Sequence, residues 1–228
     1  MFDPRYATGL TGQVVRRLDA FNQRHPWSHN DHFHGWILRR LPPARRTALD
    51  VGCGRGQLVE ALAGRFEQVD GIDRDAEMAR LAGERLAADP RVTIRQTPFA
   101  QVTGAYDLIT MVAVLHHLEL EPALAHARDL LAPGGRLLVV GLARVSTPLD
   151  LAWELTSAMI NPLVGMVKHP RADTSGPRRP PFPVLDPALT YGEIRAGARR
   201  ELPGAHQRRQ LHFRYTLDWT KPEPPRVL

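Results

Sequence analysis

The chain has 228 residues, 43% of them hydrophobic, which is enough for one well-buried domain and too few for two large ones. It contains no apolar run of about 18 residues, no secretory-signal layout in its first residues and a single cysteine, Cys53. We therefore expect a cytoplasmic protein without a membrane span, a disulfide framework or a cysteine-based metal site.

The net charge of +6 is spread along the chain and comes almost entirely from arginine. A surface built for nucleic acid would concentrate its positive charge on one face or in one run. The charge pattern therefore disfavours nucleic acid as the main partner.

Two helices are expected before the first strand. Residues 10–22 form an amphipathic helix, and a second helix begins at a cap formed by Asn30 or Asp31 and runs to about Arg40. Its buried stripe comprises Phe33, Ile37 and Leu41. Four histidines lie between residues 25 and 34, but a single helix shows neither converging ligands nor a carboxylate or cysteine partner, so we expect no metal.

A strand, a glycine loop and a helix follow one another. Residues 47–51 form a short apolar strand, Gly52, Gly54 and Gly56 form the loop, and residues 57–66 form the helix. This arrangement binds an anionic or polar ligand group at the helix N-terminus, and the glycines would leave bare backbone for that ligand. The dinucleotide-binding fingerprint places its third glycine one residue later, which disfavours a nicotinamide-dependent reductase.

A second strand is expected over residues 68–73, and it ends on Asp73, 17 residues beyond Gly56. A carboxylate at this position can accept hydrogen bonds from both hydroxyls of a ribose. The alternative is that Asp73 caps the next helix, expected over residues 75–88, whose inward face holds Met78, Leu81 and Ala82.

Two further strands are expected over residues 92–95 and 106–111, and the second is followed by His116 and His117. A histidine with a pKa near neutrality can act as a general base for an oxygen or nitrogen nucleophile. A histidine pair at the start of a helix can equally be a hydrogen-bonding cap, and the sequence leaves both interpretations open.

The rest of the chain continues the alternation of helix and strand. We expect a helix over residues 119–131, a Pro-Gly-Gly turn, a strand over 136–141 and a helix from Ser146 to about Ile160. The proline-rich residues 161–187 lie across the pocket mouth or form a disordered loop. The chain then closes the sheet with a helix over 191–200 and antiparallel strands over 206–211 and 213–220.

Several segments resemble the class I S-adenosylmethionine-dependent methyltransferases, in particular the bacterial small-molecule type (type 11/12-like). The segments are Leu-Asp-Val-Gly-Cys-Gly-Arg-Gly at 49–56, Tyr-Asp-Leu-Ile at 106–109, Leu-His-His at 115–117 and Leu-Leu-Ala-Pro-Gly-Gly-Arg-Leu-Leu-Val-Val at 130–140. The resemblance implies an α/β fold with a Rossmann-like, seven-stranded, mostly parallel sheet, helices on both faces and the last strand antiparallel. It also implies an enzyme that uses S-adenosyl-L-methionine.

The resemblance implies a role for each matching position. The loop backbone holds the methionine part, Asp50 supports the loop and the amino group, and Asp73 holds the ribose. The acid that usually follows strand three and bonds the adenine amino group is missing, so backbone groups or the Thr97 hydroxyl are expected to make that hydrogen bond, with Phe99 packing on the adenine. The remaining cofactor positions implied are Cys53, Arg74, Met78, Met111, Val112 and Ala113, and the catalytic candidates are His116 and His117.

Trp27, His29, Asn30 and His34 resemble an N-terminal segment of the same bacterial subgroup, which implies a lid over the pocket. Each of them can equally belong to a capped helix that packs on the core. The expected organisation is a lid segment at 1–43, a cofactor-binding core at 44–145, an inserted helix and loop at 146–189 and a C-terminal part of the core at 190–228. The predicted function is methyl transfer to a small-molecule acceptor. The alternatives are a non-catalytic cofactor-binding protein and an RNA methyltransferase.

Overall fold

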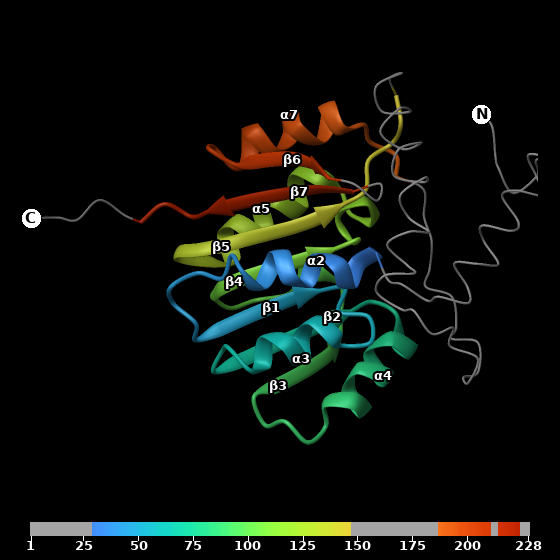
Figure 1. Ribbon diagram of the computed structural model, residues 1–228, viewed down its shortest axis with the longest axis vertical. Helices are drawn as coiled ribbons and strands as arrows, with labels where there is room; N and C mark the ends of the chain where they lie inside the picture. The colour runs from blue at the N-terminus through green and yellow to red at the C-terminus, as the bar shows by residue number, and fades with distance from the viewer. Residues whose placement is uncertain (1–28, 147–186, 211–213, 224–228) are drawn as a thin grey trace, which may run out of the picture.

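The computed structural model describes residues 29–146, 187–210 and 214–223. These residues form one sheet with the strand order β3-β2-β1-β4-β5-β7-β6 (Figure 1). The strands are β1 (Thr47–Val51), β2 (Gln68–Asp73), β3 (Val92–Gln96), β4 (Tyr106–Val112), β5 (Leu131–Gly141), β6 (His206–Gln210) and β7 (Arg214–Thr220).

The strand directions confirm the predicted fold class. Strands β1 to β5 pair in parallel, and β7 pairs antiparallel to both β5 and β6. Of the strands described, β7 therefore runs against the other six. The last strand in the sequence does not lie at the edge of the sheet, because it is inserted between β5 and β6.

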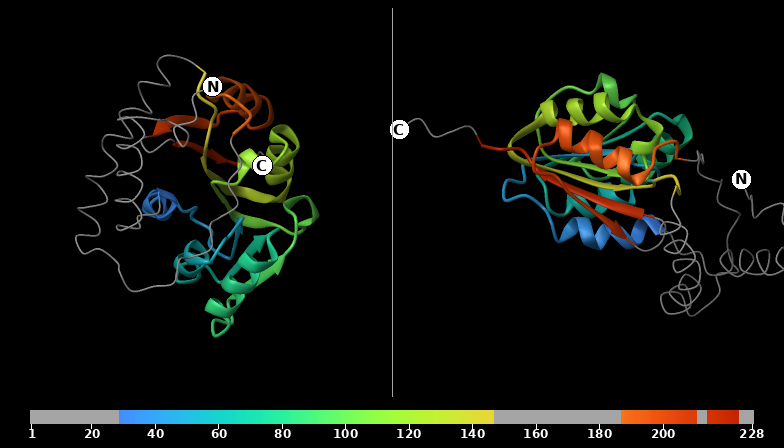
Figure 2. Two further views of the ribbon diagram at one scale, coloured as in Figure 1. Left: turned by 90° about the vertical axis from the view of Figure 1, so that its right-hand side faces the viewer. Right: turned by 90° about the horizontal axis from the view of Figure 1, so that it is seen from above.

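Helices cover both faces of the sheet (Figure 2). One face carries α2 (His29–Leu38), α3 (Gln57–Ala63) and α4 (Ala76–Leu86), whereas α5 (Leu120–Leu130) and α7 (Tyr191–Glu201) cover the other. Two short 3-10 helices, η2 (Phe99–Gln101) and η3 (Leu115–His117), follow β3 and β4. Among the described residues no helix is both long and apolar enough to cross a bilayer.

Alternation along the central strands produces two cores, one on each side of the sheet. Leu49 and Val51 of β1 point into the core under α5, and Ala48 points into the core under α2 and α3. Strand β4 is buried along nearly its whole length, as expected of a central parallel strand covered on both faces.

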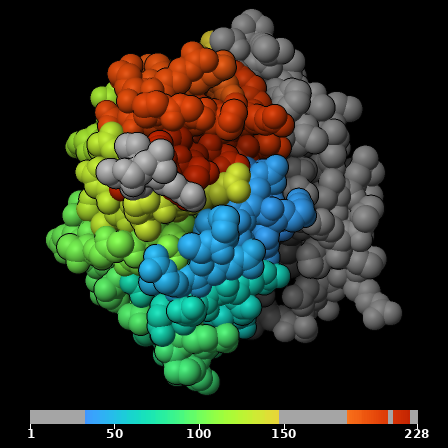
Figure 3. All heavy atoms as spheres, turned by 90° about the vertical axis from the view of Figure 1, so that its left-hand side faces the viewer, coloured from blue at the N-terminus to red at the C-terminus, as the bar shows by residue number. Residues whose placement is uncertain are grey.

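Helix α2 lies across the sheet beside α3 and β5 (Figure 3). Its buried residues are Phe33 and Ile37, as the sequence predicted, and Leu41 is half-buried. The predicted cap is wrong, because α2 already includes His29 and places Asn30 and Asp31 inside the helix. The helix also ends at Leu38, two residues before the expected end at Arg40.

Other boundaries also differ from the sequence prediction; for example, α3 was expected to reach residue 66 and ends at Ala63. Helix α4 is capped by Asp75, whose Oδ1 accepts from the backbone N–H groups of Glu77 and Met78 at 2.9 and 3.0 Å, so the alternative that Asp73 caps it is wrong. Strand β5 begins at Leu131 rather than 136, and its register with β4 shifts after the first pair. Gly135 allows this shift, because a Cβ there would lie 2.7 Å from a backbone oxygen.

The expected helices at residues 10–22 and 146–160 lie outside the described residues almost entirely, as does the proline-rich segment. The residues that follow β5 lie beside the residues that precede α7. The N–H of Arg144 donates to the carbonyl of Leu189 at 2.7 Å, and Arg144 pairs with Thr190. Thr190 then begins α7 with a reciprocal capping box that includes Glu193.

Candidate functional site

The strand order reverses between β1 and β4, and in open α/β sheets ligands bind at the carboxyl ends of the strands at such a point. Three sequence-predicted segments meet this edge. The glycine loop follows β1, Asp73 ends β2, and Ala113 with η3 follows β4. The fold thus brings together candidates that lie between Asp50 and His117 in the sequence.

The three loop glycines have positive φ angles of 70°, 54° and 79° at positions 52, 54 and 56. Gly56 also begins α3, and a Cβ on it would lie 2.9 Å from Leu86 of α4. A Cβ on Gly52 would lie 2.2 Å from Val114. Gly52 and Gly56 are therefore required by their backbone conformation, as expected for some of these glycines, and also by internal packing.

The loop does not form a cradle of free N–H groups for a phosphate. The N–H groups of Gly52 and Cys53 both donate to the carbonyl of Ile72, at 2.8 and 2.9 Å, and the N–H of Gly56 donates to the Cys53 carbonyl. The N–H of Gly54 donates to Asp73 at 2.9 Å. A pyrophosphate would need such groups to be available, so the geometry disfavours a dinucleotide.

Asp50 lies beneath this loop at the end of β1 and is only 3% exposed. Thr110 of β4 donates its hydroxyl to Oδ1 of Asp50 at 2.6 Å. Burial raises the pKa of this carboxyl to about 7, and the negative charge of Asp73 adds to the rise, while the Thr110 hydrogen bond opposes it. A ligand cation at this position would restore the ionised form.

Asp73 is half-buried at the end of β2, and both of its carboxylate oxygens accept backbone hydrogen bonds. Oδ2 accepts from Gly54 and Oδ1 from Asp75, each at 2.9 Å. Each oxygen keeps a second lone pair, so both can still accept from ribose hydroxyls. The two backbone bonds fix the orientation of the carboxylate toward the loop.

Several predicted cofactor positions are buried in the protein. Burial, together with the charges of Asp50 and Asp73, raises the pKa of the Cys53 thiol well above its usual range, so this side chain stays neutral and packs in the core. Phe99 is 5% exposed and meets His126 of α5 edge-to-face at 4.8 Å. The other buried positions are Met78 and Met111, whereas Thr97 and Val112 are half-buried and Arg74 is exposed.

The backbone turns sharply where β4 ends. Ala113 has φ 56°, the one positive value at a non-glycine residue in the described chain, and its N–H donates to Val140 of β5 at 2.7 Å. A non-glycine residue in this region stores strain of about 1 kcal/mol or more. The turn directs Val114 onto Gly52 and starts η3 with its two histidines.

His116 and His117 lie against each other with ring centroids 4.1 Å apart, but they face different neighbours. Burial lowers the pKa of His116 to about 4, helped by the charges of His117 and Arg214. The pKa of His117 is also lowered, by burial and by Arg74, against an opposing effect of Asp73. The charges at the end of β2 therefore act on His117, and the charge of Arg214, at the start of β7, acts on His116.

The Nδ1 atoms of His116 and His117 are both buried, and within the described residues neither has a hydrogen-bond partner. Buried polar atoms in proteins are nearly always satisfied, so these two Nδ1 atoms are open to a ligand, to water or to residues outside the described part of the chain. The sequence could not reveal this, nor the contacts of Thr110, Val114 and Arg214 with the site, because each depends on register between distant strands.

The structure describes the side chain of only one of the four predicted lid residues. Trp27 lies outside the described residues, and so do the side chains of His29 and Asn30 in α2. His34 is half-buried on α2. Within the described part of the chain, no group of three or more His, Cys, Asp or Glu side chains could hold a metal ion.

Comparisons with known proteins identify relatives of this chain among the methyltransferases. A family model described as a methyltransferase domain matches residues 49–137. An uncharacterized methyltransferase of Mycobacterium tuberculosis is 35% identical over 204 residues, covering 86% of this chain and 98% of that protein. The ubiquinone biosynthesis O-methyltransferase of Xanthomonas axonopodis pv. citri is 33% identical over 123 residues, which cover 51% of this chain and 52% of that enzyme.

Solved structures share the fold at lower identity. N-methyltransferase NodS from Bradyrhizobium japonicum, in complex with S-adenosyl-L-homocysteine, is 18% identical with a TM-score of 0.57, over 92% of this chain and 98% of that one. Magnesium protoporphyrin IX methyltransferase from Synechocystis, also with S-adenosylhomocysteine bound, is 19% identical with a TM-score of 0.54, over 95% and 90% of the two chains.

The residues present suit S-adenosylmethionine. Its ammonium and sulfonium are positive, and the site offers two carboxylates, Asp50 and Asp73, beside a loop with no phosphate cradle. The mycobacterial relative matches over nearly its whole length. The chain therefore belongs to the class I S-adenosylmethionine-dependent methyltransferases and is an enzyme that uses S-adenosylmethionine as its cofactor.

Proposed function

We propose that the enzyme methylates a small-molecule acceptor and that His116 is the side chain next to the acceptor nucleophile. The observation that carries the proposal is the pair of buried, unpartnered Nδ1 atoms in η3, at the end of β4 where a ligand would complete the site. The name of the Xanthomonas relative, which includes ubiquinone biosynthesis, supports a small acceptor.

The cofactor is held by the β1–β2 side of the site in this proposal. Asp73 accepts from the ribose hydroxyls, Asp50 faces the ammonium, and the loop from Gly52 to Gly56 contacts the methionine part. Arg74, Met78 and the backbone near Thr97 and Phe99 surround the adenine. Bound S-adenosylmethionine supplies a methyl group on a sulfonium, which the acceptor displaces in line, so that positioning contributes most of the rate enhancement.

His116 can take the acceptor proton because its lowered pKa keeps the ring uncharged at neutral pH. A pKa of about 4 also makes it a weak base, so its contribution is expected near the lower end of the usual range for general-base catalysis. The charges of Arg74 and Asp73 both act on His117, so we assign it to the cofactor side. Val112 and Ala113 form the turn between these two parts.

The matched variants His116→Gln and His117→Gln test these roles. The assay follows S-adenosylhomocysteine release with a panel of phenols, amines and carboxylic acids. We expect His116→Gln to lower kcat about 100-fold with little change in KM for the cofactor. We expect His117→Gln to raise KM for the cofactor several-fold and to change kcat less.

Two outcomes would contradict the proposal. If both variants retain wild-type kcat, the histidines do not contact the reacting atoms. If the panel shows no turnover while RNA is methylated, the acceptor is not a small molecule.

A further inference from the structure

Thr110 holds the carboxylate of Asp50 from the neighbouring strand. The two residues are direct partners in the parallel register of β1 and β4, at the point where the strand order reverses. Thr110 is fully buried, and its Oγ1 lies 2.6 Å from Oδ1 of Asp50 and 3.4 Å from the carbonyl of Leu49. Hydrogen bonds to an ionised acceptor are shorter and stronger than neutral ones.

Oδ2 of Asp50 remains for a ligand. Thr110 provides the one hydrogen bond that reaches the Asp50 carboxylate from the described residues, and it uses Oδ1. The side chains packed on this face are apolar, so they cannot compensate a buried negative charge; they include Phe33 and Ile37 of α2 and Leu58 and Leu62 of α3.

Among the described residues, one charged group acts on the carboxyl of Asp50. Asp73 at the end of β2 is the charge that acts on it, and it disfavours ionisation. The neighbouring Cys53 stays neutral because the pKa of its thiol is raised. The hydroxyl of Thr110 is thus the group in the described site that favours the ionised form of Asp50 in the absence of ligand.

We infer that Thr110 is a positioning residue for cofactor binding: it orients Asp50 and keeps it ionised so that Oδ2 receives the ammonium of S-adenosylmethionine. This inference rests on the proposed placement of that ammonium at Asp50. Thr110 does not touch the ligand and acts through the carboxylate. Thr216 is another buried threonine, but it does not have this role, because its hydroxyl accepts a hydrogen bond from Gln210 of β6 at 3.0 Å.

Calorimetric titrations between pH 5.5 and 8 test the inference with two ligands. S-adenosylhomocysteine carries the ammonium, and 5′-methylthioadenosine lacks the whole amino acid part. In the wild type, affinity for the first ligand should fall as pH falls through the pKa of Asp50, near 7, because binding must then expel a proton. Affinity for methylthioadenosine should not depend on pH in this range.

Thr110→Val keeps the shape and removes the hydroxyl. We expect it to lower the affinity for S-adenosylhomocysteine about tenfold at pH 7. The pH at which this affinity is lost should rise by about one unit. The affinity for methylthioadenosine should change less than about twofold. Thr110→Ser should restore wild-type behaviour. Thr216→Val is the matched control and should leave the affinities for both ligands unchanged.

The outcomes separate the inference from the proposed function. Equal weakening of both ligands, or an unchanged pH midpoint, would show that Thr110 has only a structural role. If Thr110→Val does not fold, the wild-type and Thr110→Ser titrations still decide, since a pH-independent S-adenosylhomocysteine affinity overturns the inference. Failure of the wild type to bind either ligand would instead refute the cofactor placement itself.

Discussion

Asp73 connects the glycine loop to α4 through the two oxygens of one carboxylate. Replacing it with alanine removes the acceptors for Gly54 and Asp75 together with the proposed contacts to the ribose. We expect Asp73→Ala to weaken S-adenosylhomocysteine at least tenfold, about 1.4 kcal/mol, in calorimetric titration. Binding within twofold of the wild type would mean that the ribose is held elsewhere.

Asp50 makes the enzyme less stable at neutral pH when no ligand is bound. The pKa of this carboxyl is about 7 in the folded protein, whereas its ordinary value, which applies to the unfolded chain, is 3.8. Between these values the folded state binds a proton that the unfolded state has lost, so the free energy of unfolding decreases as pH rises from about 4 to 7. The buried position of Asp50 is therefore a cost that cofactor binding offsets.

The isosteric variant Asp50→Asn cannot ionise and should not show this loss. We expect the unliganded variant to be more stable than the wild type by on the order of 1–3 kcal/mol at pH 8, with a smaller difference at pH 5. Urea unfolding at the two pH values measures it. The same variant should bind S-adenosylhomocysteine more weakly. A stability difference that does not change with pH would contradict the assignment.

At the scale of single elements, α4 provides a control for the site. Asp75 caps this helix by accepting from the N–H groups of Glu77 and Met78, but its carboxylate makes no described contact with the glycine loop. We expect Asp75→Ala to lower the free energy of unfolding by about 1 kcal/mol. Thermal unfolding should shift down by about 2–4 °C.

Cofactor affinity of Asp75→Ala should stay within about twofold of the wild type, since Asp73 keeps both of its own hydrogen bonds. A loss of affinity as large as that of Asp73→Ala would mean that the start of α4, rather than the carboxylate of Asp73, determines binding.

The sequence predicts those elements whose signals are local. Strands β1 and β2 match their expected bounds because apolar runs end at glycine or at an acid. The start of β5 was missed because it depends on Gly135 fitting against the backbone of β4, a contact made across the sheet. The start of α2 was missed because polar residues can lie in a first turn as well as cap it.

The same limit applies to the site. Glycine spacing and the acid at the end of β2 are visible in sequence, whereas the Thr110–Asp50 hydrogen bond joins residues 60 positions apart. The division between the two histidines likewise follows from Arg74, after β2, and Arg214 of β7, which belong to strands on either side of β4 in the strand order. Contacts of this kind depend on tertiary register, which no local pattern encodes.

At the scale of the whole molecule, charged groups join the segment after α2 to β5 and β7. Arg136 of β5 forms a bidentate pair with Asp218 of β7, at 2.7 and 2.8 Å, and also donates to the carbonyl of Arg40 at 2.9 Å. Arg40 itself lies over the ring of Trp36. The segment between α2 and the glycine loop is therefore fixed to β5 and β7.

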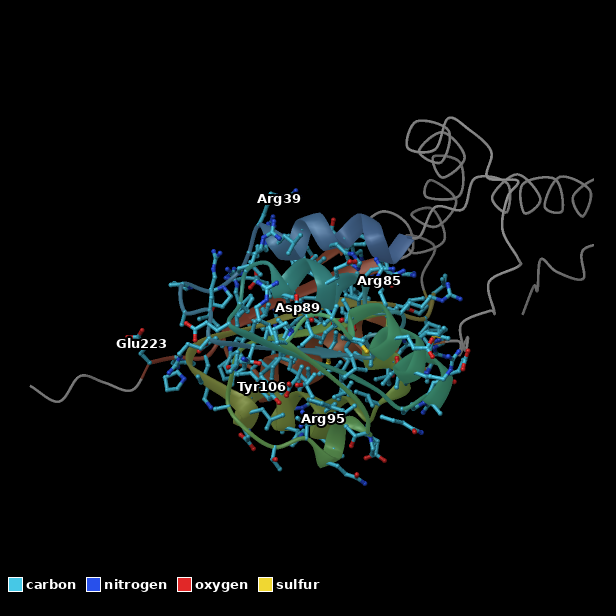
Figure 4. The ribbon with its side chains drawn as sticks, turned by 90° about the horizontal axis from the view of Figure 1, so that it is seen from below. Arg39, Arg85, Asp89, Arg95, Tyr106 and Glu223 are labelled. Carbon is cyan, nitrogen blue, oxygen red and sulfur yellow. The ribbon has the colours of Figure 1, made fainter. Side chains whose placement is uncertain are left out.

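The remaining charge distribution bears on the RNA alternative. In the described chain many arginines pair with acids rather than forming a basic patch, and Arg39, Arg85 and Arg95 lie on separate parts of the surface (Figure 4). The paired arginines include Arg46, Arg80, Arg85, Arg91, Arg95, Arg128, Arg136 and Arg200. Arginines neutralised in this way release few counterions from a nucleic acid.

We therefore expect weak binding of a 20-nucleotide RNA despite the net charge of +6. In fluorescence anisotropy between 50 and 300 mM salt, the slope of log affinity against log salt should be shallower than about −1. S-adenosylhomocysteine affinity, measured at the same salt concentrations, controls for any effect of salt on the fold. A slope of about −3 or steeper means that the protein makes several phosphate contacts. Methylation of a small molecule requires no such contacts, so this result would favour RNA over a small molecule as the acceptor.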